Sequence, residues 1–195
     1  MRQTVFIPAH RNPFRSERVE ALTYRETDLT PADIIATCRL AHHGRGALTG
    51  PKGSGKTTLL LEIARALETQ GKTPLLIRLN ETNRHIDWQA LREQTPLCSA
   101  LLVDGAEQLG LISWWRRRWL VRGVPLLIIT THGSGRLPTL HRHRTTPELL
   151  TALVDELLAD VPAGMVIPSR DALPSLFNHH GGDIRQCLRA LYDQV

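Results

Sequence analysis

The sequence of 195 residues lacks any run of eighteen apolar residues. Its first eighteen residues are polar and contain several arginines, so they also lack the apolar centre of a secretory signal. The first absence argues against a membrane-spanning helix, and the second argues against secretion. We therefore expect a cytoplasmic protein that is not associated with a membrane.

Cysteine and lysine are both scarce. The three cysteines, Cys38, Cys98 and Cys187, have no paired spacing, which argues against a disulfide framework or a zinc ribbon and predicts buried small side chains. Only three of the 24 Lys and Arg residues are lysines, and the formal net charge is +5. An arginine excess of this kind supports nucleic-acid binding only weakly.

The length fits one α/β domain with a small addition, and the sequence has no internal repeat. Near-continuous apolar runs predict strands covered on both faces. These runs are residues 47–49, 74–79, 100–103 and 124–130, with a more mixed fifth strand at 139–142. Helical patterns separate them, at residues 31–42, 56–69, 87–93 and 111–121. Strands that alternate with helices in this way predict a parallel α/β sheet.

Only helices are predicted beyond residue 145. They are expected at residues 147–159, 171–177 and 184–192. Thr145 and Glu148 are expected to open the first of them as a capping box. We therefore divide the chain into an N-terminal arm (1–30), an α/β domain (31–145) and a helical lid (146–195).

Residues 50–57, Gly-Pro-Lys-Gly-Ser-Gly-Lys-Thr, match the phosphate-loop pattern G-x-x-x-x-G-K-[ST] between a predicted strand and a predicted helix. Glycines let backbone N–H groups surround a phosphate, and the helix N-terminus adds partial positive charge. Lys56 is expected to bridge the β- and γ-phosphates, and Thr57 to bind Mg²⁺. The residues expected to hold ATP are Gly50, Pro51, Lys52, Gly53, Ser54, Gly55, Lys56, Thr57 and Thr58.

A second motif, which is acidic, lies at the end of the third predicted strand, where the apolar run is followed by Asp104. This is the form of a Walker B segment, in which the carboxylate holds Mg²⁺. Many ATPases place a glutamate directly after that aspartate, but here the next residue is Gly105. Glu107 is the first candidate for the base that orients the attacking water, and Glu81 is the second. If neither serves, the protein binds ATP as a switch and hydrolyses it poorly.

Four sequence features taken together resemble a small AAA+ ATPase in the style of the initiator and transposition-helper branch. They are the phosphate loop, Val103-Asp104 with Glu107, the strand end Thr130-Thr131-His132, and the segment 180–188, which contains Gly-Asp-Ile-Arg. The resemblance covers about residues 10–195. It implies a five-stranded parallel sheet of order 5-1-4-3-2 with a C-terminal helical lid.

The resemblance also implies roles for single residues. Thr131, or else Thr130, matches the sensor 1 position that contacts the γ-phosphate or the attacking water. Arg185 matches sensor 2, an arginine that reaches the nucleotide from the lid. Such sites are shared between subunits, and Arg136, with Arg122 second, is the candidate arginine finger. We therefore expect a homo-oligomer or a partner protein.

The overall prediction is an ATP-binding protein that hydrolyses ATP with Mg²⁺ to drive or switch assembly with a partner, with a DNA transaction as one option. The first alternative is a non-hydrolysing, nucleotide-dependent scaffold. The second is a small-molecule kinase, for which Arg84 and Arg92 are thin support. Three tryptophans and three arginines within residues 114–119 suit either a nucleic-acid or protein interface, or packing on the sheet.

Overall fold

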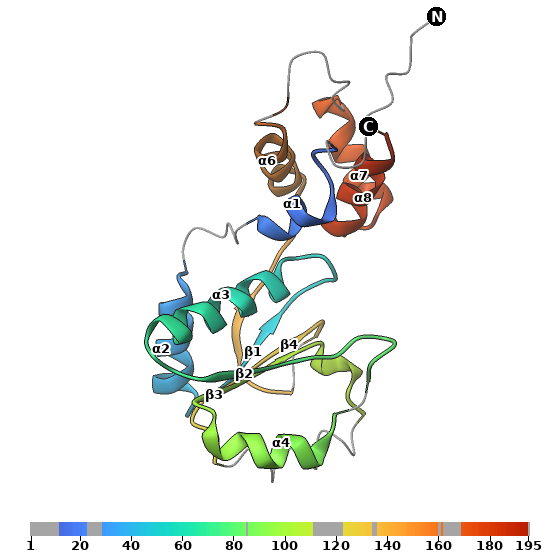
Figure 1. Cartoon of the computed structure of the whole chain (residues 1–195). Coiled ribbons are helices and arrows are strands. Elements are labelled where there is room, and N and C mark those ends of the chain that lie inside the picture. Colours follow the sequence, from blue (N-terminus) through green and yellow to red (C-terminus); the bar gives the residue numbers. More distant parts are fainter. Residues whose placement is uncertain are drawn as a thin grey trace, which may run out of the picture. The chain divides into compact units, whose positions relative to one another are not determined.

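The computed structural model describes residues 12–22, 29–84, 86–110, 123–133, 136–159, 161 and 169–194. Figure 1 labels its helices and strands. The chain forms two compact units, one of residues 24–50 and 55–143, the other of residues 1–23, 51–54 and 144–195. Among the described residues, no helix combines the length and apolarity that a membrane span requires.

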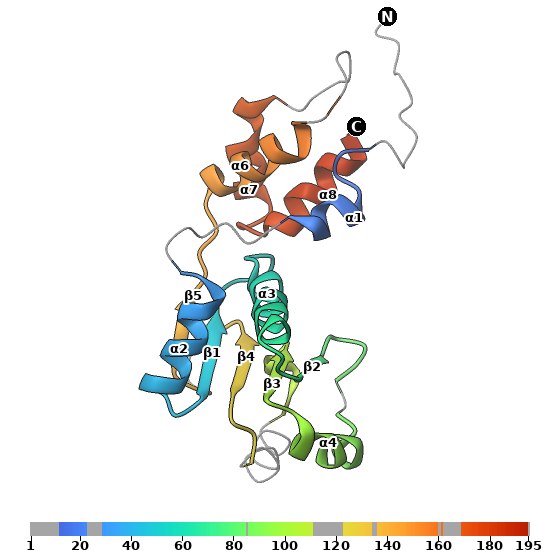
Figure 2. The same cartoon turned by 60° about the vertical axis from the view of Figure 1, so that its left-hand side comes forward.

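The first unit is built on a five-stranded sheet in which every neighbouring pair is parallel. Its strands are β1 (Arg45–Thr49), β2 (Pro74–Arg78), β3 (Ala100–Asp104), β4 (Leu127–Thr131) and β5 (Thr139–Arg142). They lie in the order β2-β3-β4-β1-β5, as Figure 2 shows. The predicted order 5-1-4-3-2 is therefore confirmed. It places β1, which leads into the phosphate loop, beside β4, and β4 beside β3, which ends in Asp104.

Both faces of the sheet are covered, as the apolar strands predict. One face packs against α2 (Pro31–Ala41) and α3 (Lys56–Thr69), and α4 (Trp88–Gln94) lies on the other (Figure 1). Strand residues alternate between the two cores: Leu102 joins the first, whereas Leu101 and Val103 join the second. Two short 3₁₀ helices, η2 (Thr95–Leu97) and η3 (Ala106–Gln108), flank β3 in sequence.

Two local expectations need correction. β4 begins at Leu127 rather than at residue 124. Pro125 lies among the three residues that were predicted as strand but precede β4, and a proline has no N–H to hydrogen-bond with a neighbouring strand. The helix after β5 is capped by Thr146, whose side chain accepts a hydrogen bond from the N–H of Leu149, and not by Thr145.

The second unit is helical. It contains α1 (Ser16–Ala21), α6 (Pro147–Leu158), η4 (Arg170–Ala172), α7 (Leu173–His179) and α8 (Ile184–Gln194). Phe14 is 3 % exposed and joins the core that the three C-terminal helices form. The Asn12 side-chain amide donates to the carbonyl of Tyr192 at 2.9 Å. The chain segment before α1 therefore packs with the C-terminal helices.

The cysteines are free thiols, with Cys38 and Cys187 buried and Cys98 partly buried. Burial raises the pKa of the Cys38 thiol to about 11. The thiol is therefore neutral at ordinary pH, as expected of a small packed side chain.

Candidate nucleotide-binding site

The phosphate loop connects β1 to α3 through backbone conformations that favour glycine. Gly53 has φ +75° and Gly55 has φ +86°, both in the left-handed region. Gly55 is also the N-cap of α3, a helix of fourteen residues whose first N–H groups have no partner within the helix. Of the residues expected to hold ATP, Ser54 is buried, whereas Pro51 and Lys52 are exposed.

Lys56 lies in the first turn of α3 and is only 7 % exposed. Its Nζ donates to the carbonyl oxygen of Gly50 at 2.8 Å. The ammonium group is therefore held across the loop, from the end of β1 to the start of α3. A buried ammonium needs such an oxygen partner, and a phosphate oxygen is an alternative acceptor for it.

Thr57 and Asp104 meet although they are 47 residues apart in the chain. The Thr57 hydroxyl, on α3, lies 2.9 Å and 3.2 Å from the two carboxylate oxygens of Asp104 at the end of β3. These hydroxyl and carboxylate oxygens are hard donors of the kind that Mg²⁺ prefers. The described residues contain no cluster of three or more His, Cys, Asp or Glu side chains that could hold a metal.

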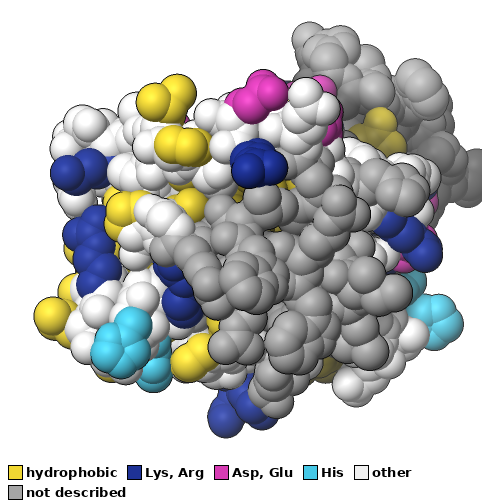
Figure 3. Space-filling view, turned by 90° about the horizontal axis from the view of Figure 1, so that it is seen from below, with side chains coloured by type: hydrophobic (Ala, Val, Ile, Leu, Met, Phe, Trp, Pro, Cys, Tyr) yellow, Lys and Arg dark blue, Asp and Glu magenta, His cyan; other side chains and the backbone are white. Residues whose placement is uncertain are grey.

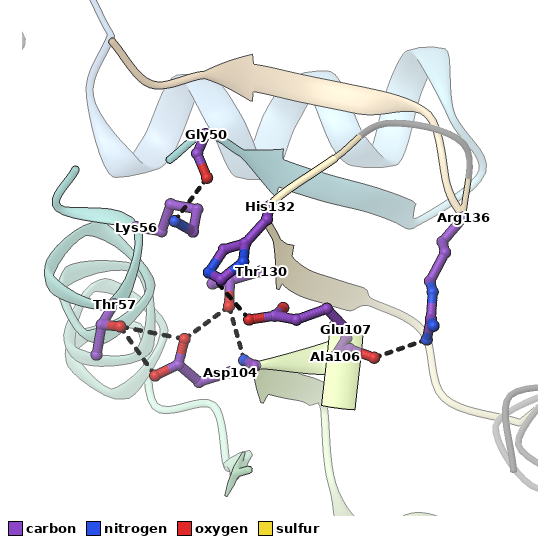
Figure 4. A network of polar contacts seen from close by, with 10 residues as sticks. Gly50, Lys56, Thr57, Asp104, Ala106, Glu107, Thr130, His132 and Arg136 are labelled. Carbon is purple, nitrogen blue, oxygen red and sulfur yellow. Dashed lines mark hydrogen bonds and ion pairs between the residues drawn. The ribbon is translucent and has the colours of Figure 1, made fainter. Parts of the chain in front are cut away.

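Asp104 is also tied to β4. The Thr130 hydroxyl donates to Asp104 Oδ1 at 2.6 Å and accepts from the N–H of Gly105 at 2.8 Å (Figure 4). Thr131 contributes its backbone carbonyl, which accepts from the N–H of Gly50 at 3.3 Å. Of the two sensor 1 candidates, it is thus the second choice, Thr130, whose hydroxyl contacts the acidic motif.

Gly105 has a steric reason to be glycine. Its φ is +74°, and a Cβ on it would overlap the carbonyl oxygen of Leu79, just after β2. A glutamate directly after Asp104 would meet the same overlap. The position that many ATPases use for their base is therefore closed to any side chain without a backbone shift.

Glu107 stands on η3, close to the end of β4. Its Oε1 lies 3.2 Å from Nε2 of His132, the residue that follows β4 (Figure 4). The Glu107 side chain is 25 % exposed, and its buried Oε2 has no hydrogen-bond partner among the described residues. The contact between Glu107 and His132 was not predicted from the sequence. It arises because the parallel register pairs Val103 with Ile129 and so brings the ends of β3 and β4 together.

Glu81, the second candidate base, is exposed in the turn after β2. The turn is organised by Asn80, whose Oδ1 accepts from the N–H groups of Thr82 and Asn83. The carbonyl of Glu81 in turn accepts from Nε of Arg84 at 3.0 Å.

The candidate arginines differ in their surroundings. Arg136 donates from Nη1 to the carbonyl of Ala106 at 2.6 Å and from Nη2 to that of Leu109 at 2.8 Å. Its guanidinium is thus bound by two backbone carbonyls of its own chain. Arg185 is exposed on α8, whose start lies beside the phosphate loop: a Cβ on Gly53 would come within 3.1 Å of the backbone N of Arg185. Arg122, and the segment 114–119, lie outside the described residues.

Figure 3 shows one face of the protein, seen from below relative to Figure 1. Lys and Arg side chains, with His side chains beside them, are spread over the described part of this face, and hydrophobic side chains lie between them. That distribution agrees with the net charge of +5 but does not form a single basic stripe in the described part.

The chain was compared with known proteins. No protein-family model and no curated protein matches it. Three solved structures resemble it: a DNA replication initiation factor (11 % identity, TM-score 0.57), AMPPCP-bound DnaA from Aquifex aeolicus (12 %, 0.56), and the replication initiator DnaA bound to AMPPCP and single-stranded DNA (11 %, 0.60). They cover 80 %, 87 % and 96 % of this chain, which in turn covers 56 %, 61 % and 65 % of theirs.

This likeness concerns the fold. Together with the phosphate loop and the parallel sheet, it shows that the chain has the fold of a P-loop NTPase of the AAA+ type. Within that class, the fold is similar to that of the replication initiator DnaA. The chain spans less than two thirds of the length of each of these three structures.

Proposed function

We propose that the protein binds ATP with Mg²⁺ at the phosphate loop and hydrolyses it to switch its assembly with a partner. The observation that carries this proposal is that a buried cation, a pair of oxygen ligands and a helix N-terminus lie together at one edge of the sheet. The Lys56 ammonium reaches across the loop to Gly50, Thr57 lies beside the carboxylate of Asp104, and both residues belong to the first turn of α3, whose N-terminus ends the loop. AMPPCP, an analogue of ATP, is bound in two of the similar structures.

Each of these groups has a definite part when the nucleotide is bound. Lys56 exchanges the Gly50 carbonyl for oxygens of the β- and γ-phosphates, and the N–H groups of the loop and of α3 surround the β-phosphate. Thr57 and Asp104 would hold Mg²⁺, which would neutralise charge on the phosphate oxygens. The Thr130 hydroxyl keeps the Asp104 carboxylate oriented toward the metal.

Glu107 is the general base in this proposal. Its carboxylate takes a proton from the attacking water; Oε1 lies 3.2 Å from His132, and Oε2 is buried with no hydrogen-bond partner among the described residues. Glu81 is the second choice because it is exposed in the turn after β2, whereas Glu107 is partly buried beside the end of β4. The assignment accounts for a glycine at position 105, since the base comes from the next turn instead.

The second candidate function is a nucleotide-dependent switch with very slow hydrolysis. The observation that favours it is the overlap at Gly105, which removes the usual base. Wild-type turnover in Mg-ATP distinguishes the two. No described contact favours the small-molecule kinase, since Arg84 is engaged with the carbonyl of Glu81 and Arg92 is exposed on α4.

The partner in this proposal is a second copy of the chain or another protein. One similar structure also contains single-stranded DNA, and the net charge of +5 is compatible with nucleic acid as a further ligand. Fluorescence anisotropy with labelled single-stranded DNA, with and without Mg-ATP, tests that part.

ATP binding is tested by thermal unfolding in the presence and absence of Mg-ATP. At about 100 times Kd, the nucleotide should stabilise the wild type by roughly 2.7 kcal/mol. Lys56→Ala should abolish the stabilisation, because the loop loses its buried cation. The control is Lys72→Ala, which removes an exposed lysine and should respond like the wild type. A wild type whose unfolding is unaffected by saturating Mg-ATP would exclude the proposal.

A further inference from the structure

The segment that carries Glu107 has little structure of its own. η3 has only three residues, Ala106–Gln108, and its N-cap, Gly105, has a left-handed conformation. Short 3₁₀ helices have poor hydrogen-bond geometry and do not hold their position unaided. The location of the Glu107 carboxylate must therefore depend on contacts from neighbouring elements.

Most of these contacts come from one place, the end of β4 and the loop that follows it. Thr130 holds the start of the segment through Asp104 and the N–H of Gly105. His132 contacts the Glu107 carboxylate itself. Arg136 reaches the backbone of the same segment farther along, so three residues within seven positions contact it (Figure 4).

Arg136 is suited to fix a backbone. Its two Nη atoms bind the carbonyls of Ala106 and Leu109, which lie on either side of Glu107. The planar guanidinium fork can satisfy both acceptors at once, which an ammonium group does not match in geometry. Ala106 and Leu109 are 0 % and 2 % exposed, so this clamp also seats η3 against the core below the sheet.

We propose that Arg136 and His132 are positioning residues that hold Glu107 from within the same chain. The inference rests on the proposed function, in which Glu107 is the base. Arg136 fixes the backbone of η3, and His132 fixes Oε1 of the Glu107 carboxylate and with it the orientation of the whole group. This assignment opposes the expectation from resemblance, in which Arg136 acts as a finger on the nucleotide of a neighbouring subunit.

The contacts favour action within the chain. A finger would have to release the carbonyls of both Ala106 and Leu109 to extend toward a neighbour. Both are charge-assisted hydrogen bonds of 2.8 Å or less, the stronger kind. Breaking these two hydrogen bonds would also free η3 during hydrolysis, when the Glu107 carboxylate must be held in place.

The deciding experiment is a double-mutant cycle on ATP turnover. Arg136→Ala should lower kcat by about 100-fold, the loss that a shift of about 1 Å in a reacting group produces, while the Kd for AMPPCP changes less than about twofold. In a Glu107→Gln background, Arg136→Ala should cause no further loss, because a residue that acts through Glu107 has nothing left to position. A full second loss in the double mutant would overturn the inference.

Mixing variants separates the two roles of Arg136 directly. When Arg136→Ala chains are mixed with Lys56→Ala chains, a finger supplied between subunits restores turnover. A clamp within the chain does not, because the chain with the intact loop still has a displaced Glu107. Arg65→Ala removes an exposed arginine of α3 and serves as the control. Restored turnover in the mixture would refute the clamp.

The role of His132 has its own readout. His132→Gln keeps a side-chain N–H donor for Glu107 and should recover most of the kcat that His132→Ala loses, with KM nearly constant in both. Equal turnover of these two variants would contradict a positioning role. This comparison does not depend on the state of assembly.

A failure of the proposed function would be visible separately, as a wild type without turnover. In that case the clamp is tested by hydrogen exchange at the N–H groups of Gln108 and Leu109, which donate within η3. Arg136→Ala should accelerate their exchange at least about tenfold, and Arg65→Ala should not. Unchanged exchange in Arg136→Ala would overturn the clamp.

Discussion

Replacing Gly105 by alanine should destabilise the α/β unit by about 3 kcal/mol, the sum of two contributions. The left-handed φ of +74° costs a residue with a Cβ about 1–2 kcal/mol. The new methyl group would also overlap the carbonyl oxygen of Leu79, and overpacking of this kind typically costs about 1–3 kcal/mol. Urea unfolding measures the loss, provided that the m-value is unchanged.

Gly71 provides a matched control for this variant. It follows α3 with φ +70°, nearly the same backbone conformation, but a Cβ there would have nothing within 4 Å. Gly71→Ala should therefore lose only the conformational contribution, about 1 kcal/mol. The difference between the two variants isolates the overlap with Leu79.

Asparagine sharpens the comparison because it tolerates the left-handed region better than alanine. Gly71→Asn should be close to wild type, whereas Gly105→Asn should remain destabilised. Equal free energies of unfolding at the two positions, with either residue, would refute the steric explanation. By the same reasoning, Gly105→Glu should lower ATP turnover rather than supply a second base.

Two further outcomes are expected. Glu107→Gln should bind nucleotide normally but slow hydrolysis by at least about 100-fold, the scale of a general base, whereas Glu81→Gln should not; the reverse pattern in a turnover assay would transfer the role to Glu81. Burial raises the pKa of the Cys38 thiol from 9.0 to about 11. Its contribution to stability is therefore complete below about pH 9 and lost as the pH rises toward 11. Unfolding free energies at pH 8 and 10.5 should fall less in Cys38→Val than in the wild type, and an equal fall would contradict the assignment.

Several features could be predicted because they depend on residues close together in the chain. The phosphate loop is a contiguous motif, and its glycines and Lys56 adopt the expected places between a strand and a helix. The four apolar runs correctly predicted β1 to β4, since strands covered on both faces need such runs, and the mixed stretch 139–142 correctly predicted the edge strand β5. Asp104 ends its strand as expected, beside Thr57. The strand order followed from the resemblance and is confirmed.

Other features depend on register and on contacts between distant segments. Which of the adjacent Thr130 and Thr131 turns its hydroxyl to Asp104 follows from the pleat, because neighbouring side chains of a strand point to opposite faces. That Gly105 excludes a side chain depends on the carbonyl of Leu79, which only the pairing of β2 with β3 brings close.

The contacts of Arg136 also depend on segments that are distant in the sequence. In the sequence it is an arginine in a loop, with the reach to serve a neighbouring subunit. In the fold, the β3–β4 pairing brings that loop over η3, where the guanidinium meets two backbone carbonyls of its own chain. Sequence alone thus determined which chemical groups are present, because local motifs specify the loop and the acidic strand end. Tertiary structure decided which groups contact each other, because a hydrogen bond depends on positions that only the packed sheet defines.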